Sequence, residues 1–179
     1  MTSSMALQGA SSSLSSTSSS IHSWTHDVFL SFRGEDVCQK FISHLYHALH
    51  HRGINTGIDK NLERGEEISP ELFKAIERSM ISIIVLSKNY LESRWCLDEL
   101  LKIIECKENV KQIVLPLFYD VSSSEVRHQK GNFGEAFAKL GCKIKDEENV
   151  TKWKAALQKV ANFFGFTLGD RVQTKSKPL

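Results

Sequence analysis

Trp95 and Glu99 are the two residues of this sequence whose types and spacing could do chemistry together. They lie four residues apart in the stretch Ser93–Leu101, and four residues make about one turn of a helix. An indole and a carboxylate one turn apart at a helix entrance could form one wall of a binding site. They could equally be a core tryptophan and a solvated glutamate, since most glutamates in proteins are exposed.

A single carboxylate can support a reaction when the leaving group departs easily. The nicotinamide of NAD is cationic, so breaking its bond to ribose needs no general acid. Glu99 could hold the ribose hydroxyls and stabilise the oxocarbenium character of the transition state. Trp95 could stack on a base, and Arg33 could bind phosphate. On the pattern alone, a core tryptophan and a solvated arginine are equally good interpretations.

The helix that carries this pair has one apolar stripe. The stripe predicts a buried face and comprises Leu97, Leu100, Leu101 and Ile104. Glu99 projects at roughly 200° from Leu97, counting about 100° per residue, and so faces away from the stripe. Ser93 precedes the helix and is a candidate N-cap.

Short apolar runs alternate with amphipathic segments along the chain. Strands are predicted at 27–33, 54–58, 81–86 and 112–119, and Pro116 indicates an edge position or a bulge in the last of them. The helices that follow have predicted buried faces that include Ala48, Met80 and Phe164. This order predicts an α/β fold, a parallel sheet with helices on both faces.

In such folds, ligands bind at the carboxyl ends of the strands. That rule places the loops 31–36 and 59–67 and the helix entrance at 93–95 along one rim. Other chemistries find no support. Gly34 alone does not make a dinucleotide-binding turn, and there is no P-loop lysine pattern. The third strand lacks the terminal aspartate of a phospho-acceptor, and no serine or cysteine nucleophile has a recognisable base.

Composition limits the class of protein further. The chain has 179 residues, 41% hydrophobic and 25% charged, which is typical of one soluble globular domain. A formal charge of +2 gives no reason to expect nucleic-acid binding, and no apolar run is long enough for a membrane span. The four cysteines form no Cys-x-x-Cys pair, so no metal site is expected, and reduced thiols are predicted.

The predicted domain lies between two tails, at 1–23 and 167–179, and itself covers 24–166. The first tail has eleven serines and no Asp, Glu, Lys or Arg, so we expect disorder rather than a secretory signal. A transit peptide is less favoured because no Arg or Lys precedes Arg33. We expect a cytoplasmic protein, with a nuclear location left open.

Several motifs resemble those of plant TIR domains and occur in that family's order. They are DVFLSFRGED at 27–36, LERGEEI at 62–68, SKNY at 87–90, SRWCLDEL at 93–100 and FGEAF at 133–137. The resemblance implies a flavodoxin-like, three-layer fold and a role in plant innate immune signalling and disease resistance. It also implies NAD hydrolysis on self-association, with release of nicotinamide and nucleotide signals, and with NAD as substrate rather than cofactor.

The resemblance also assigns residues. The catalytic glutamate of the family corresponds to Glu99. Positions implied to contact NAD are Ser31, Phe32, Arg33, Gly34, Glu35, Asp36, Gly65 and Trp95. The loop 59–68 corresponds to one that completes a neighbour's site, and self-association with other TIR domains is implied for Ser43, His44 and Gly165.

Some positions depart from the family pattern, and they leave two functions open. Gly57 stands where the family usually has an aromatic residue, Val37-Cys38 replace Thr-Arg, and Ser122-Ser123 replace Asp-Pro. An NAD hydrolase is favoured because the carboxylate and its surroundings are present. The alternative is a non-catalytic adaptor that acts through contacts between TIR domains.

Overall fold

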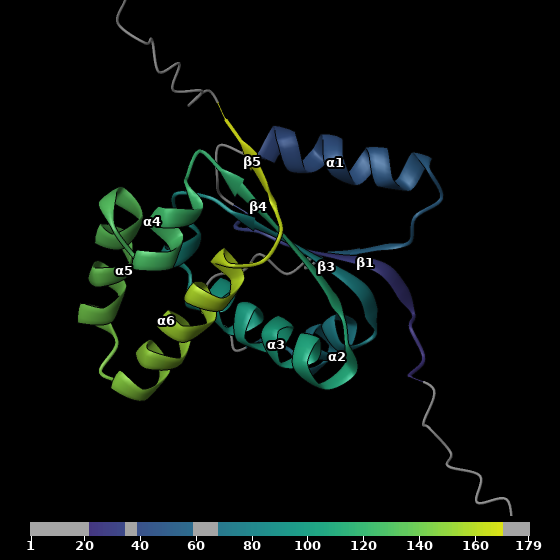
Figure 1. Cartoon of the computed structure of the whole chain (residues 1–179). Helices are drawn as coiled ribbons and strands as arrows, with labels where there is room; N and C mark the ends of the chain where they lie inside the picture. Colours follow the sequence, from purple (N-terminus) through teal and green to yellow (C-terminus); the bar gives the residue numbers. More distant parts are fainter. Residues whose placement is uncertain (1–21, 35–38, 59–67, 170–179) are drawn as a thin grey trace, which may run out of the picture.

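The centre of the molecule is a five-stranded parallel sheet, shown in Figure 1, a computed structural model that describes residues 22–34, 39–58 and 68–169. Its strands lie in the order β2-β1-β3-β4-β5. They are β1 (His26–Ser31), β2 (Thr56–Ile58), β3 (Ser79–Leu86), β4 (Ile113–Tyr119) and β5 (Phe166–Leu168). This confirms the predicted α/β fold with a parallel sheet.

Helices cover both faces of the sheet. They are α1 (Gln39–His51), α2 (Pro70–Glu77), η1 (Tyr90–Glu92), α3 (Arg94–Val110), α4 (Ser123–His128), α5 (Gly131–Lys143) and α6 (Glu147–Ala161). Helix α1 packs on one face, where Ile42 joins Val85 and Leu117 in a small core. Helices α2, α3 and α6 lie on the other side (Figure 1). The main core is there, and α3 lies between α2 and α6 in that layer.

The start signals of three helices act as side-chain caps. Ser69 precedes Pro70 and accepts the Leu72 N–H, and Ser93 accepts the Cys96 N–H at 3.2 Å. Ser122 forms a complete capping box with Glu125, so the serine that replaces a family aspartate still starts a helix. The cap at Ser93 sets where α3 begins and therefore where Trp95 and Glu99 point.

The structure corrects the prediction at the end of the chain. Residues 166–168 form β5, although a tail was predicted from 167, because three residues are too short for a recognisable strand pattern. Strand β4 therefore has a neighbour on each side and is not an edge. Pro116 is in register with Ile84 of β3, and β5 begins to pair only at Leu117, so the proline lies just outside that shared stretch.

Three predicted core residues are not buried. Ala48 is exposed on α1, where Ile42 is the buried residue instead. Met80 belongs to β3 rather than to the preceding helix, and it is 39% exposed. Phe164 follows the end of α6 and is 78% exposed. In the described part of the chain, no helix is both long and apolar enough to cross a membrane.

Candidate functional site

Glu99 is a buried carboxylate in the second turn of α3. Its residue is 2% exposed, although the helix periodicity placed it opposite Leu97. Of the predicted stripe on α3, Leu97, Leu100 and Ile104 are buried, and Leu101 is half-buried at its margin. A buried carboxylate is costly unless hydrogen-bond donors surround it, so Glu99 needs partners that the sequence does not indicate.

One such partner is Ser31, the last residue of β1. Ser31 is inaccessible to solvent, and its Oγ donates to Glu99 Oε2 over 2.7 Å. The 2.7 Å separation is typical of a charge-assisted hydrogen bond from a hydroxyl. The carboxyl end of β1 and the first turns of α3 therefore meet, as the strand-end rule predicted.

Tyr90 of η1 extends this hydrogen-bonded group. Its Oη lies 3.0 Å from Ser31 Oγ and donates to the backbone oxygen of Cys96 over 2.9 Å. Burial raises the pKa of Tyr90 well above its ordinary value, and the nearby Cys96 and Glu99 raise it further. Tyr90 is therefore a neutral hydroxyl at any physiological pH.

Arg33 lies two residues beyond Ser31 and is directed towards η1. Its Nη1 donates to the backbone oxygen of Asn89 over 2.7 Å and to Glu92 Oε2 over 3.3 Å. The side chain is 19% exposed, so it is not fully shielded from solvent. An arginine in this position could still meet a phosphate, at the cost of its bond to the exposed Glu92.

The other predicted contact residues lie around this group. Phe32 packs beside the small core under α1, and its backbone oxygen lies 3.7 Å from Cys96 Sγ. Gly34 is buried and accepts a hydrogen bond from Gln39. Trp95 is half-buried against the main core, and its Nε1 has no hydrogen-bond partner among the described residues. Glu35, Asp36, Gly65 and the loop 59–67 lie outside the described residues.

The predicted self-association residues lie away from Glu99. Ser43 and His44 are exposed on α1. Gly165 connects α6 to β5, and a Cβ there would collide with the backbone oxygen of Pro116. Gly165 therefore has a packing role of its own, whatever else it contacts.

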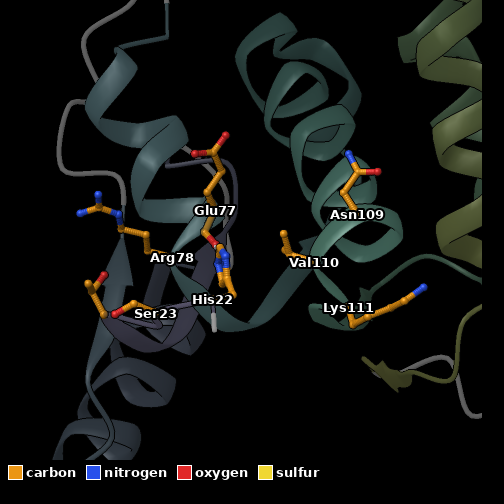
Figure 2. A pocket seen from close by; sticks show the side chains of 8 residues that line it. His22, Ser23, Glu77, Arg78, Asn109, Val110 and Lys111 are labelled. Atoms are coloured by element: carbon orange, nitrogen blue, oxygen red, sulfur yellow. The ribbon is translucent and has the colours of Figure 1, made fainter. Parts of the chain in front are cut away.

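A hollow of about 680 Å³ lies at the opposite edge of the sheet (Figure 2). It is lined by His22, Ser23, Thr25, Glu77, Arg78, Asn109, Val110 and Lys111. These residues precede β1 and β3 or end α3, whereas Ser31 and Glu99 lie at the carboxyl ends of the strands. The hollow is therefore separate from the candidate site. No group of three or more potential metal ligands occurs among the described residues.

Tyr90 is the residue of this site that sequence reasoning assigned no role. The motif SKNY at 87–90 was recognised, but nothing in it shows that the phenol reaches Ser31, 59 residues earlier. The same holds for the burial of Glu99. Both depend on how η1, β1 and α3 meet.

Comparison with known proteins shows to which family the chain belongs. The family model described as TIR domain matches residues 25–177. The chain belongs to the TIR domain family. It is 53% identical over 159 residues to disease resistance protein RPV1 of Vitis rotundifolia, and 52% identical over 151 residues to TMV resistance protein N of Nicotiana glutinosa.

These alignments cover 89% and 83% of this chain but only 11% and 13% of the two relatives. The TIR domain thus spans a small part of the curated relatives it matches. Among solved structures, it is similar to the TIR domains of the activated Roq1 resistosome, which directly recognises the pathogen effector XopQ. That match has a TM-score of 0.73 and 48% identity, and it covers 80% of this chain and 87% of the other. The flavodoxin-like TIR fold is therefore confirmed.

Proposed function

We propose that this TIR domain hydrolyses NAD in plant immune signalling, with Glu99 as the catalytic residue. The observation that carries the proposal is the Glu99 carboxylate, held by the Ser31 hydroxyl at the carboxyl edge of the sheet. This is the edge where folds of this architecture bind ligands. The resemblance to plant TIR domains supplies the substrate.

The reaction breaks the bond between the ribose C1′ and the nicotinamide nitrogen. The nitrogen keeps the electron pair and leaves as neutral nicotinamide, and positive charge develops on the ribose. The Glu99 carboxylate stabilises that charge, water adds at C1′, and a proton is released with ADP-ribose. In this proposal, Arg33 binds phosphate in exchange for its bond to Glu92, and Trp95 supplies an aromatic face at the helix entrance.

The burial of Glu99 suggests when this reaction occurs. At 2% exposure, the carboxylate cannot meet a ribose until the groups covering it move. A rearrangement on self-association with other TIR domains would provide that opening. The Roq1 relative is described in an activated resistosome, which supports an assembly-dependent activity. We propose a cytoplasmic or nuclear site of action, with NAD as substrate and no cofactor.

The test is nicotinamide release by concentrated protein, or by protein fused to an oligomerising partner. We expect Glu99→Gln and Glu99→Ala to lower the turnover of NAD by at least about 100-fold. Glu105→Gln is the matched control, because Glu105 is an exposed carboxylate on the same helix, and it should retain wild-type turnover. Undiminished turnover by Glu99→Ala would falsify the catalytic assignment.

A second candidate is a non-catalytic adaptor that binds other TIR domains. The exposed aromatic pair Phe164 and Phe166, 78% and 51% accessible with ring centroids 5.5 Å apart, favours a protein contact. In that case, NAD remains intact in every assembled state. The same nicotinamide measurement therefore separates the two functions.

A further inference from the structure

We propose that Tyr90 is a positioning residue for the reaction at Glu99 and that it acts through Ser31. This inference rests on the proposed NAD hydrolysis. The phenol does not contact Glu99 by any hydrogen bond in the described site. Its Oη lies 3.0 Å from Ser31 Oγ, which donates to Glu99 Oε2 over 2.7 Å. The three side chains come from η1, β1 and α3.

Counting protons shows what Tyr90 can do. Each hydroxyl has a single proton, and an ionised Glu99 accepts the one from Ser31. Ser31 Oγ can then only accept from Tyr90. The phenol proton is also directed towards the backbone oxygen of Cys96, at 2.9 Å. That carbonyl lies within α3 and also accepts the helical N–H four residues on, so sharing the phenol proton leaves no backbone group unsatisfied.

A protonated Glu99 would reverse the direction of the chain. The carboxyl would donate to Ser31 Oγ, Ser31 would donate to Tyr90 Oη, and Tyr90 would donate to Cys96. In the ionised state, the single phenol proton is shared between Ser31 Oγ and the Cys96 backbone oxygen. The share directed towards Ser31 strengthens the bond from Ser31 to Glu99, because successive hydrogen bonds polarise one another. Tyr90 therefore favours the ionised carboxylate that the reaction needs and holds it in one orientation.

The surroundings support a relay rather than a general packing role. Ser31 and Tyr90 are both inaccessible to solvent, so water does not compete for either hydroxyl. The titratable groups that act on the phenol are Cys96 and Glu99, and burial keeps the phenol neutral. Arg33 leaves the end of β1 in another direction, towards Asn89 and Glu92.

The first experiment is a double-mutant cycle on NAD turnover. We expect Tyr90→Phe to lower kcat by about 3- to 10-fold, with KM little changed, and Ser31→Ala to lower it by about 10- to 100-fold. The double variant should be no worse than Ser31→Ala, because Tyr90 acts through Ser31. Tyr119→Phe is the matched control, since Tyr119 packs with Phe41 on the other face of the sheet. Additive losses would contradict the proposal.

The second experiment needs no turnover. The chemical shift of the Glu99 side-chain carboxyl is followed by carbon-13 NMR as a function of pH in the wild type, in Tyr90→Phe and in Tyr119→Phe. We expect Tyr90→Phe to move the Glu99 titration to higher pH by about half a unit and Tyr119→Phe to leave it unchanged. An unchanged titration in Tyr90→Phe would overturn the proposal. If the wild type does not hydrolyse NAD, the proposed function fails while this titration still tests the relay.

Discussion

At the scale of single residues, the candidate site depends on which groups form hydrogen bonds with its buried ionisable side chains. Glu99 has Ser31 as a donor within a dry site, and Tyr90 supports that donor. In low-dielectric surroundings, a fully paired carboxylate is held rigidly, whereas losing one donor costs the full desolvation of the group. A rigid, preorganised charge is what stabilisation of an oxocarbenium ion requires.

Cys106, further along α3, gives a stability prediction with a defined sign. Burial raises the pKa of this thiol from 9.0 to about 11. Above pH 9, the unfolded chain loses the proton while the folded chain keeps it. Stability is thus unaffected below pH 9 and falls as pH rises towards 11. At pH 10.5, the loss is about 2 kcal/mol.

Urea unfolding under reducing conditions at pH 8 and pH 10.5 checks this prediction. Tyr90 contributes a loss of the same sign at still higher pH, so the informative quantity is the difference between variants. Cys106→Ala should lose about 2 kcal/mol less than the wild type between the two pH values. Equal losses in both proteins would show that Cys106 is not the group responsible.

At the scale of elements, α3 connects the candidate site to the core. Its apolar face packs into the main cluster, and Asp98, beside Glu99, accepts a 3.0 Å hydrogen bond from Trp153 Nε1 of α6. Lys102 of α3 bonds Glu77 of α2 over 2.6 Å. The helix is thus fixed on both flanks, and the position of Glu99 depends on where its first turn begins.

Ser93 is the N-cap at which α3 begins, so replacing its side chain should destabilise the first turn of this helix. Ser93→Ala leaves the Cys96 N–H without its 3.2 Å side-chain acceptor. We expect the free energy of unfolding to fall by about 1 kcal/mol in a urea titration. Ser93→Asn, which retains a capping oxygen, is the matched control and should lie within a few tenths of a kcal/mol of the wild type. Equal stability of the alanine and asparagine variants would show that the cap contributes nothing.

At the scale of the whole molecule, the two faces of the sheet are unequally covered. Among the helices that the structure describes, α1 covers one face while α2, α3 and α6 cover the other (Figure 1). Exposed apolar side chains remain at Ile113, Phe164 and Phe166, near the β4–β5 side. Exposed apolar groups of this kind are candidates for contact with another protein surface.

His44 and Gly165 should respond differently when mutated, although both were predicted to lie at self-association surfaces. The resemblance to plant TIR domains predicts that His44 lies at a self-association surface, and His44 is exposed on α1. His44→Ala should therefore weaken self-association in sedimentation experiments while leaving Tm unchanged.

Gly165→Ala places a methyl group against the Pro116 backbone, so we expect Tm to fall by about 5 °C or more. A Gly165→Ala protein with wild-type Tm would show that the backbone around β5 can shift to accept the methyl group without loss of stability.

The sequence by itself determined the alternation of strands and helices, the cap at Ser93 and the edge of the sheet on which the candidate site lies. Each of these follows from local rules, since apolar periodicity, Ser before a helix and Pro70 at a first turn act within a few residues. The motif match added Glu99 as the catalytic choice, which spacing alone could not distinguish from a solvated residue.

Only the tertiary structure decided that Glu99 is buried, that Ser31 donates a hydrogen bond to it, and that Tyr90 lies next to Ser31. A helical periodicity gives directions around the helix axis, but the neighbours decide which of those directions reach solvent. Here Ser31 at the end of β1 meets α3 on the side opposite its apolar stripe. Strand β5 escaped prediction for the same reason, since three residues form a strand only because β4 offers its edge.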